Sequence, residues 1–179
     1  AFRPLFLATI PAALGSTLLC GLFPTRLHEL GFPLTYGGFA ALLFGLGNAV
    51  GSMGWALLAR RWGELRCARW ALGAGVPATL LFLLTLRHRW ALPFLWLAGA
   101  TAGSAFALMV AHARHARGGV LGQRMAWMVG GSWGVSSLAL MAVGPVADRF
   151  GTAPVLHLVW IAYLAGALVV GRLATLPAR

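Results

Sequence analysis

The stretch LGFPLTYGGFAALLFGLGNAVGSMGWALLA, residues 30–59, contains no charged side chain and decides the fold class. An α-helix rises 1.5 Å per residue, so about 20 residues cover the roughly 30 Å hydrocarbon core of a bilayer. A helix satisfies its own backbone hydrogen bonds, which lipid cannot do for it. The stretch is therefore predicted to cross a membrane as a helix.

Five further uncharged runs flank this stretch, and each is long enough for a membrane span if the shortest, residues 70–86, borrows flanking residues. Barrel strands would be about ten residues long with alternating character, which these runs lack. The first run exceeds the roughly 7 to 15 apolar residues of a signal peptide, so we expect it to remain a span. The sequence predicts an all-α membrane protein with six transmembrane helices, the other five being Pro4–Thr25, Trp70–Leu86, Trp90–Ala113, Met125–Ala147 and Phe150–Gly171.

The composition agrees with a lipid environment, because 60% of residues are hydrophobic and only 9% are charged. The 14 cationic residues are all arginine and face three acids, which gives a net charge of +11. A nucleic-acid interface would gather these arginines on one face among aromatic residues. Here they occur in small groups between the apolar runs, so the expected partner is the lipid bilayer and no nucleic acid is expected.

The arginines also predict the orientation, because cationic loops are retained on the cytoplasmic side. With six spans and a cytoplasmic amino terminus, ten arginines fall inside and four outside. Both termini are therefore predicted to be cytoplasmic. The inner set is Arg3, Arg60, Arg61, Arg66, Arg69, Arg114, Arg117, Arg124, Arg172 and Arg179, and the outer set is Arg26, Arg87, Arg89 and Arg149.

An internal repeat is suggested when the chain is aligned with itself at a shift of 88 residues, which places 58–63 on 146–151. This shift predicts two three-helix repeats, residues 1–89 and 90–179, within one transmembrane domain. Because three is odd, the repeats would have opposite orientations, as in the inverted repeats of secondary transporters. A chance match is the alternative.

Two segments carry a family resemblance. GSMGWALLARRWG, residues 51–63, resembles the Gly-x-x-x-Asp-Arg-x-Gly loop signature of the major facilitator superfamily, and GPVADRFG, residues 144–151, is similar to its weaker counterpart. PTRLHELG, residues 24–31, and RGGVLG, residues 117–122, resemble the fosmidomycin-resistance group of bacterial efflux transporters, carboxy-terminal half.

This resemblance implies half of a major facilitator fold: a secondary transporter that exports a small-molecule solute by alternating access across a bacterial inner membrane. It implies an amino-terminal six-helix half, or a second copy of the chain, as partner, and no cofactor. It also implies a cytoplasmic gate loop of Gly54, Arg60, Arg61, Gly63 and Glu64, with a repeat-related loop of Asp148, Arg149 and Gly151.

The gate loop departs from the family pattern at one position, because Arg60 stands where the signature has Asp. We expect Arg60 to pair with Glu64 at i,i+4, an exposed pair that contributes about 0.3 to 0.5 kcal/mol. Asp148 is expected just before the sixth helix, where a negative charge favours the helix dipole or caps the helix.

Polar residues inside spans supply the cavity candidates, since polar groups in lipid tend to face protein or water. Asn48 is equally compatible with interhelical bonding and cavity lining, whereas hydroxyls commonly bond their own helix one turn back. No span contains a carboxylate, so proton coupling would need a histidine or the partner half; His112 and His157 are better interpreted as packed or interfacial. The cavity candidates are Thr9, Ser16, Asn48, Thr101, Ser104, Trp133 and Ser136.

Glycines at four-residue spacing predict close helix contacts at Gly47/Gly51, Gly99/Gly103 and Gly130/Gly134. The second, fourth and fifth spans, which carry these pairs, are therefore expected to be interior or sliding helices, with the third and sixth facing lipid.

An enzyme is the alternative class, because residues 130–134 match the Gly-x-Ser-x-Gly pattern around Ser132, and six-span rhomboid proteases use a membrane serine. The run around Ser132 is expected to be an unbroken helix and His157 to lie nearer the outer surface, which disfavours a catalytic pair. No catalytic residue is predicted.

His112 and His115 lack a third ligand, so no metal site is predicted either. A non-transporting membrane subunit is the remaining alternative.

Overall fold

A computed structural model of the protein describes residues 2–88, 90–115 and 120–175, and all of its regular secondary structure there is helical. Six spans are long and apolar enough to cross a membrane, which is the architecture of a multi-pass membrane protein. The first three spans are continuous helices: α1 (Phe2–Glu29), α2 (Leu34–Trp62) and α3 (Glu64–Thr85). The remaining elements are α4 (Ala91–Ala98), η1 (Gly99–Gly103), α5 (Ser104–His115), α6 (Leu121–Ala126), η2 (Trp127–Gly131), α7 (Ser132–Phe150) and α8 (Thr152–Thr175).

The prediction of six membrane helices is confirmed, and the predicted short third span does borrow residues, since α3 begins at Glu64. The fourth and fifth spans each contain a π-helical segment, η1 and η2, where the uncharged runs predicted regular helix. In each case the π-segment continues the axis of the span, so the chain still crosses once.

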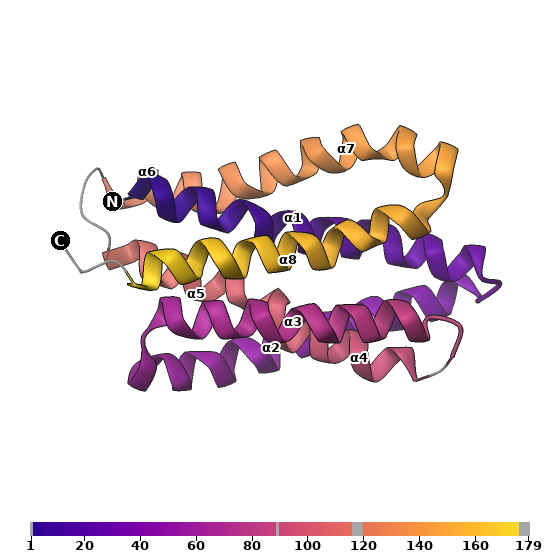
Figure 1. The fold of residues 1–179 in the computed structure, drawn as a ribbon, viewed down its shortest axis with the longest axis horizontal. Helices are drawn as coiled ribbons and strands as arrows, with labels where there is room; N and C mark the ends of the chain where they lie inside the picture. The colour runs from indigo at the N-terminus through magenta and orange to yellow at the C-terminus, as the bar shows by residue number, and fades with distance from the viewer. Residues whose placement is uncertain (1, 89, 116–119, 176–179) are drawn as a thin grey trace.

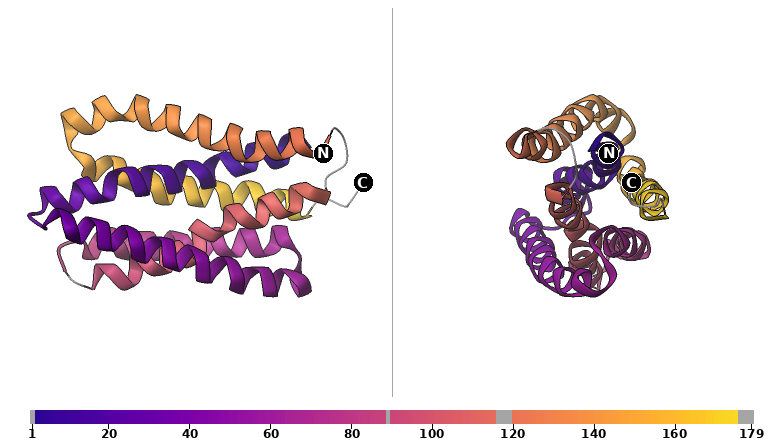
Figure 2. Two further views of the ribbon diagram at one scale, coloured as in Figure 1. Left: turned by 180° about the vertical axis from the view of Figure 1, so that it is seen from behind. Right: turned by 90° about the vertical axis from the view of Figure 1, so that its left-hand side faces the viewer.

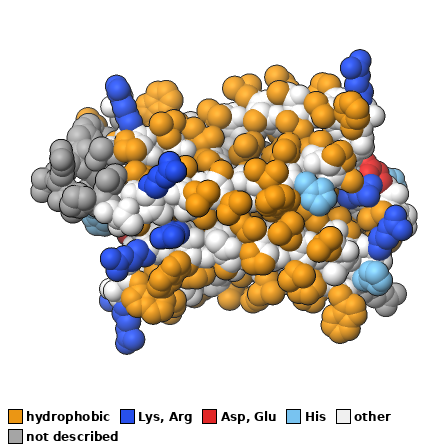
Figure 3. Space-filling view, in the orientation of Figure 1, with side chains coloured by type: hydrophobic (Ala, Val, Ile, Leu, Met, Phe, Trp, Pro, Cys, Tyr) orange, Lys and Arg blue, Asp and Glu red, His pale blue; other side chains and the backbone are white. Residues whose placement is uncertain are grey.

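All six spans run roughly along the long axis of the molecule (Figure 1). The amino terminus, the α2–α3 turn and the end of α8 lie at one end, and the α1–α2 and α7–α8 turns lie at the other. An apolar belt separates these ends, and arginines gather at both of them (Figure 3). Of the arginines assigned above, Arg89, Arg117 and Arg179 lie outside the described residues.

Two tight connections depend on glycine. Gly63, between α2 and α3, has φ +84°, and Gly151, between α7 and α8, has φ +81°. Side chains with a Cβ rarely adopt this region, so glycine allows the chain to reverse with a single non-helical residue. The Gly63 amide also donates to the Ala59 carbonyl at 2.9 Å, which closes the end of α2.

The core forms where α1, α3, the fourth span and α8 meet. Phe23 of α1 and Phe82 of α3 stack edge to face with ring centroids 6.2 Å apart, and both are fully buried. Tyr163 of α8 is also fully buried and lies over Gly15 of α1. In the end-on view of Figure 2, α7 and α2 lie at opposite edges of the bundle.

The prediction that the glycine-rich second and fifth spans are interior was wrong. Only 17% of the apolar window of each is buried, against 44% for α3 and for α8. The physical reason is that α8 packs along both α1 and α3, which places α3 and α8 in the core, whereas α2 and α7 each contact the bundle along one face.

Candidate functional site

A close helix contact joins α2 to the fourth span. Gly47 and Gly51 of α2 lie directly against the backbone of Trp96 and Ala100, and a Cβ on either glycine would overlap these atoms. Gly99 lies in the same way against the Phe44 carbonyl. We call these residues the α2/η1 crossing. The predicted glycine contact is confirmed for Gly47, Gly51 and Gly99.

The π-segment η1 lies at this crossing, and one of its backbone carbonyls accepts hydrogen bonds from side chains. The Ala100 carbonyl accepts from the Trp55 indole at 3.0 Å and from the Ser104 hydroxyl at 2.9 Å. Trp55 therefore ties α2 to η1 across the crossing. π-helical turns recur at functional sites because they free backbone carbonyls from the regular ladder. The signal available in the sequence was the Gly-Ala-Thr-Ala-Gly run at residues 99–103.

Three cavity candidates lie in or beside this crossing. Asn48 is half-buried, its Oδ1 accepts from the Ser52 hydroxyl at 3.2 Å, and it lies beside Gly103. The Thr101 hydroxyl donates to the Leu97 carbonyl of its own helix at 2.6 Å. Ser104 is similarly bonded one turn back, as is common for hydroxyls in membrane helices.

A second polar contact joins α1 to α7. The Thr9 and Ser132 hydroxyls lie 2.8 Å apart, and Ser136 donates to the Ser132 carbonyl at 2.8 Å. All three residues are fully buried. Ser16 forms a separate link to α8, with its hydroxyl 3.2 Å from that of Tyr163. The hydroxyl-bearing cavity candidates are thus all engaged with protein in this structure.

Ser132 also bears on the enzyme alternative. The span that contains it is helical from Leu121 to Phe150, as predicted, but the π-segment η2 ends directly before Ser132. Its hydroxyl nevertheless pairs with Thr9, and His157 is exposed on α8. A serine nucleophile needs a base within about 3.2 Å of its hydroxyl. Thr9 cannot act as that base.

We expect Ser132→Ala to lower the free energy of unfolding by about 1 kcal/mol, because the buried Thr9 hydroxyl loses one of its two partners. Thermal unfolding in detergent measures this change, and Ser137→Ala, an exposed serine on the same helix, is the matched control. Equal midpoints for the two variants would contradict the structural role. Loss of cleavage of a membrane substrate in Ser132→Ala alone would instead favour the protease.

The exposed part of α2 has two distinct faces. Large apolar side chains occupy one face, and small residues occupy the other. At 100° per residue the small positions fall within one stripe along the helix. We call this stripe the small face of α2. The large face is Phe39, Leu42, Leu46, Val50, Met53 and Leu57, and the small face is Gly38, Ala41, Gly45, Ala49 and Ala56, together with the half-buried Ser52.

A shorter stripe of small residues follows η2 and α7, where Gly130, Gly134 and Ser137 are exposed at helical spacing; Met141, the next position along the stripe, is large and 72% exposed. A Cβ placed on Gly130 or Gly134 would meet nothing within 4 Å. The predicted glycine contact at Gly130/Gly134 is therefore not formed with any residue that the structure describes. Trp133, the last cavity candidate, stacks edge to face on Phe106 of α5 with centroids 5.6 Å apart, and remains 41% exposed.

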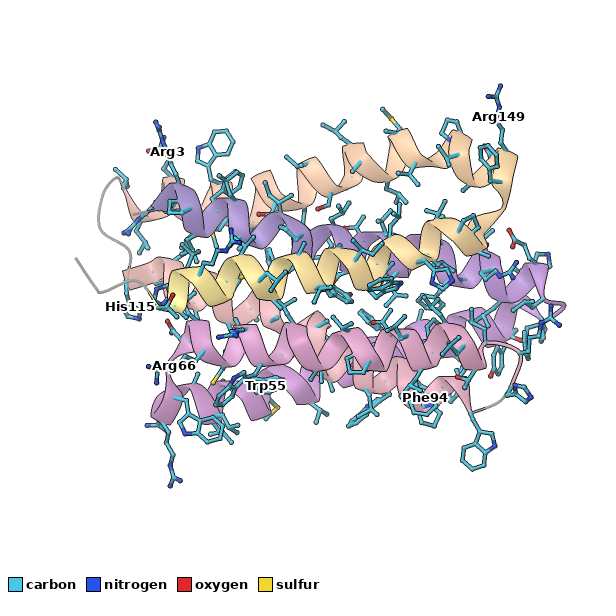
Figure 4. All side chains as sticks on the ribbon, viewed as in Figure 1. Arg3, Trp55, Arg66, Phe94, His115 and Arg149 are labelled. Atoms are coloured by element: carbon cyan, nitrogen blue, oxygen red, sulfur yellow. The ribbon has the colours of Figure 1, made fainter. Side chains whose placement is uncertain are left out.

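The predicted gate segment lies at the end that also holds Arg3, Arg66 and His115 (Figure 4). The prediction of a loop was wrong for Gly54, Arg60 and Arg61, which belong to α2; only Gly63 is non-helical. The predicted Arg60–Glu64 pair is not formed either, because Glu64 binds His112 of α5 at 3.0 Å. Both residues line an open hollow of about 400 Å³, together with Ala56, Ala59, Arg60, Gly63 and His115.

The other predicted loop also needs correction. Asp148 and Arg149 lie in the last turn of α7, and only Gly151 connects to α8. Asp148 is exposed, at a helix end where the dipole disfavours an acid. Glu29 of α1 occupies the position expected for Asp148, because its carboxylate accepts from the Thr152 hydroxyl at 2.8 Å and from Arg26 at 2.9 Å.

We expect Glu29→Ala to lower the free energy of unfolding by about 1 kcal/mol, since it removes the contact that ties the end of α1 to the first turn of α8. Asp148→Ala removes an exposed carboxylate at the same end of the molecule and should change the free energy by less than about 0.5 kcal/mol. Thermal unfolding of the two variants compares them directly. A larger loss in Asp148→Ala would contradict this assignment of roles.

Within residues 2–88, 90–115 and 120–175, no group of three His, Cys, Asp or Glu side chains could hold a metal ion. Comparison of the chain with protein-family models, with curated proteins and with solved structures found no match.

Proposed function

We propose that the chain is one six-helix half of a secondary transporter of the major facilitator type, which exports a small solute by alternating access. The observation that carries the proposal is the pair of exposed small-residue stripes on α2 and α7. Both helices lie at edges of the bundle, where a second helical unit can reach them.

Exposed glycine is informative in a membrane helix. Lipid chains are as apolar as leucine, so a lipid-facing surface gains nothing from glycine, whereas glycine and serine let two helix backbones approach closely. On α2 the large apolar face suits lipid and the small face suits a helix. The small face of α2 and the small-residue stripe on α7 therefore favour contact with a second six-helix unit, either an amino-terminal half or a second copy of this chain.

The positions of the helices support two inverted repeats. The fourth, fifth and sixth spans begin at Ala91, Leu121 and Thr152, which lie 89, 87 and 88 residues after the starts of α1, α2 and α3. Two of the three positive-φ glycines among the described residues, Gly63 and Gly151, are likewise 88 residues apart.

The packing of the spans supports the same correspondence. In the proposed repeats, span one corresponds to span four, span two to span five and span three to span six. The contact of α1 with α7, which belongs to the fifth span, then corresponds to the contact of the fourth span with α2. The α1–α8 contact corresponds to that of the fourth span with α3. The contact between α3 and α8 joins spans three and six, which correspond to each other. Inverted repeats of this kind are the usual plan of secondary transporters.

The orientation is proposed from charge. The end that holds Arg3, Arg66 and His115 carries eight of the described arginines, and the opposite end carries Arg26, Arg87 and Arg149. Cationic ends of membrane proteins are retained in the cytoplasm. We therefore place both termini on the cytoplasmic side of a bacterial inner membrane. The eight are Arg3, Arg60, Arg61, Arg66, Arg69, Arg114, Arg124 and Arg172.

Solute would bind near the midplane, between this half and its partner. The α2/η1 crossing supplies the best-supported polar groups for that surface, because Asn48 is only half-buried and η1 interrupts the helix beside it. Trp133 supplies an exposed aromatic ring on the other edge. Export, rather than import, rests on the resemblance to the fosmidomycin-resistance group.

The experiment is solute flux in vesicles reconstituted with the chain and its second six-helix unit. We expect concentration-dependent flux of at least one solute from a broad panel of drug-like and metabolite molecules. The test variant is Asn48→Leu, which removes the polar group from the crossing. It should reduce flux at least about tenfold relative to the wild type while leaving folding intact. Association of the two units without any flux would instead indicate a non-transporting subunit.

A further inference from the structure

A basic hollow lies at the arginine-rich end of the molecule, separate from the α2/η1 crossing. It has a volume of about 450 Å³ and is formed where the end of α2, the first turns of α3 and the end of α8 meet. Its lining residues are Trp62, Arg66, Arg69, Trp70, Ala174 and Thr175.

The two tryptophans form one wall of the hollow. Trp62 and Trp70 stack edge to face with ring centroids 4.9 Å apart, although each remains 47% exposed. Exposed tryptophans at the ends of membrane spans lie at the level of the lipid head groups, where their amphipathic rings are favoured. The hollow is therefore at the depth of a lipid head group.

The two arginines supply its charge. Neither Arg66 nor Arg69 forms a salt bridge with a described residue, and Glu64, the one acidic side chain at this end, binds His112 instead. Arg69 lies over Gly171 of α8, so its guanidinium is held beside the hollow. Arginine binds phosphate oxygens through paired N–H groups, so two unpaired guanidinium groups favour a phosphate ligand.

We propose that this hollow binds the head group of an anionic phospholipid. The phosphate would lie between Arg66 and Arg69, and the acyl chains would run along α3 and α8 into the bilayer. Basic pockets between membrane helices bind anionic lipid head groups on the cytoplasmic side. The hollow is lined mainly by residues of α3 and α8, so lipid reaches it from the side of these two helices. The inference does not depend on transport.

Native mass spectrometry of the detergent-purified chain tests this site, with phosphatidylglycerol and phosphatidylcholine as competing probes. We expect preferential retention of phosphatidylglycerol. Arg66→Gln/Arg69→Gln should weaken its binding about thirtyfold, because each surface cation contributes about fivefold to binding of an anionic lipid. Arg66→Gln alone, which leaves the Arg69 packing on Gly171 intact, should weaken binding about fivefold.

The matched control is Arg3→Gln/Arg114→Gln, which removes the same charge at the same end but outside the hollow. A loss of less than about threefold there supports a specific site. Equal losses in the two double variants, or equal retention of both lipids by the wild type, would overturn the proposal. Displacement of the lipid by excess inorganic phosphate would also overturn it, by indicating a site for a water-soluble anion.

Discussion

Gly51→Ala is expected to destabilise the protein by about 3 kcal/mol, although alanine is the better helix former. The added methyl group would overlap the carbonyl oxygen, carbonyl carbon and Cα of Ala100. These are backbone atoms of η1, so they cannot rotate away as a flexible side chain can. Relief requires α2 to separate from the fourth span, which also breaks the Trp55 contact to Ala100. Thermal unfolding of the detergent-purified chain measures the loss.

Gly54→Ala is the matched control for this prediction. Gly54 lies one turn further along α2, and a Cβ there would meet nothing within 4 Å. The substitution should leave stability unchanged or raise it by up to about 1 kcal/mol, the difference in helix propensity. If Gly51→Ala were as stable as Gly54→Ala, the close approach of α2 to η1 would be wrong.

Gly45→Leu is expected to abolish association with the second six-helix unit while leaving this chain folded. Gly45 lies in the small face of α2 and has open space where a side chain would project. A leucine there fills the space that a facing helix would occupy, and helix contacts of this kind depend on small residues. Co-purification of the two differently tagged units should fall at least about tenfold. Solute flux should fall with it.

The matched control is Gly73→Leu on α3, since Gly73 is also exposed and a Cβ there would likewise meet nothing within 4 Å. It lies on the flank formed by α3 and α8, away from the proposed contact. Both variants should unfold at the wild-type temperature, and only Gly45→Leu should lose its partner. Equal association of the two variants would show that the small face of α2 does not bind a second unit.

The six spans could be predicted from the sequence because charge alone marks their ends. Uncharged runs separated by arginines determine where helices cross, and α3 differs from the prediction mainly by its earlier start at Glu64. The sequence could not show that a single glycine separates α2 from α3 and α7 from α8. Nothing local distinguishes Arg60 in a last helical turn from Arg60 in a loop.

The packing of the spans was harder to predict. Glycine content correctly indicated that Gly47 and Gly51 make a contact, but it could not show that Gly45 and Gly134 do not, because all four look alike in sequence. Which helices share the core depends on long-range contacts, such as that between α3 and α8. The Glu64–His112 and Glu29–Thr152 contacts, formed across 48 and 123 residues, are likewise absent from any local pattern.

Accessibility of single cysteines to a membrane-impermeant maleimide in intact cells tests the placement of the chain in the bilayer, on which every proposal above depends. In a background lacking Cys20 and Cys67, cysteines would replace exposed charged or histidine residues at both ends. We predict labelling at positions 28, 87 and 149 in intact cells, and at positions 3, 61 and 114 only after permeabilisation. Labelling of the second group in intact cells, or recovery of the chain from the soluble fraction, would contradict the account.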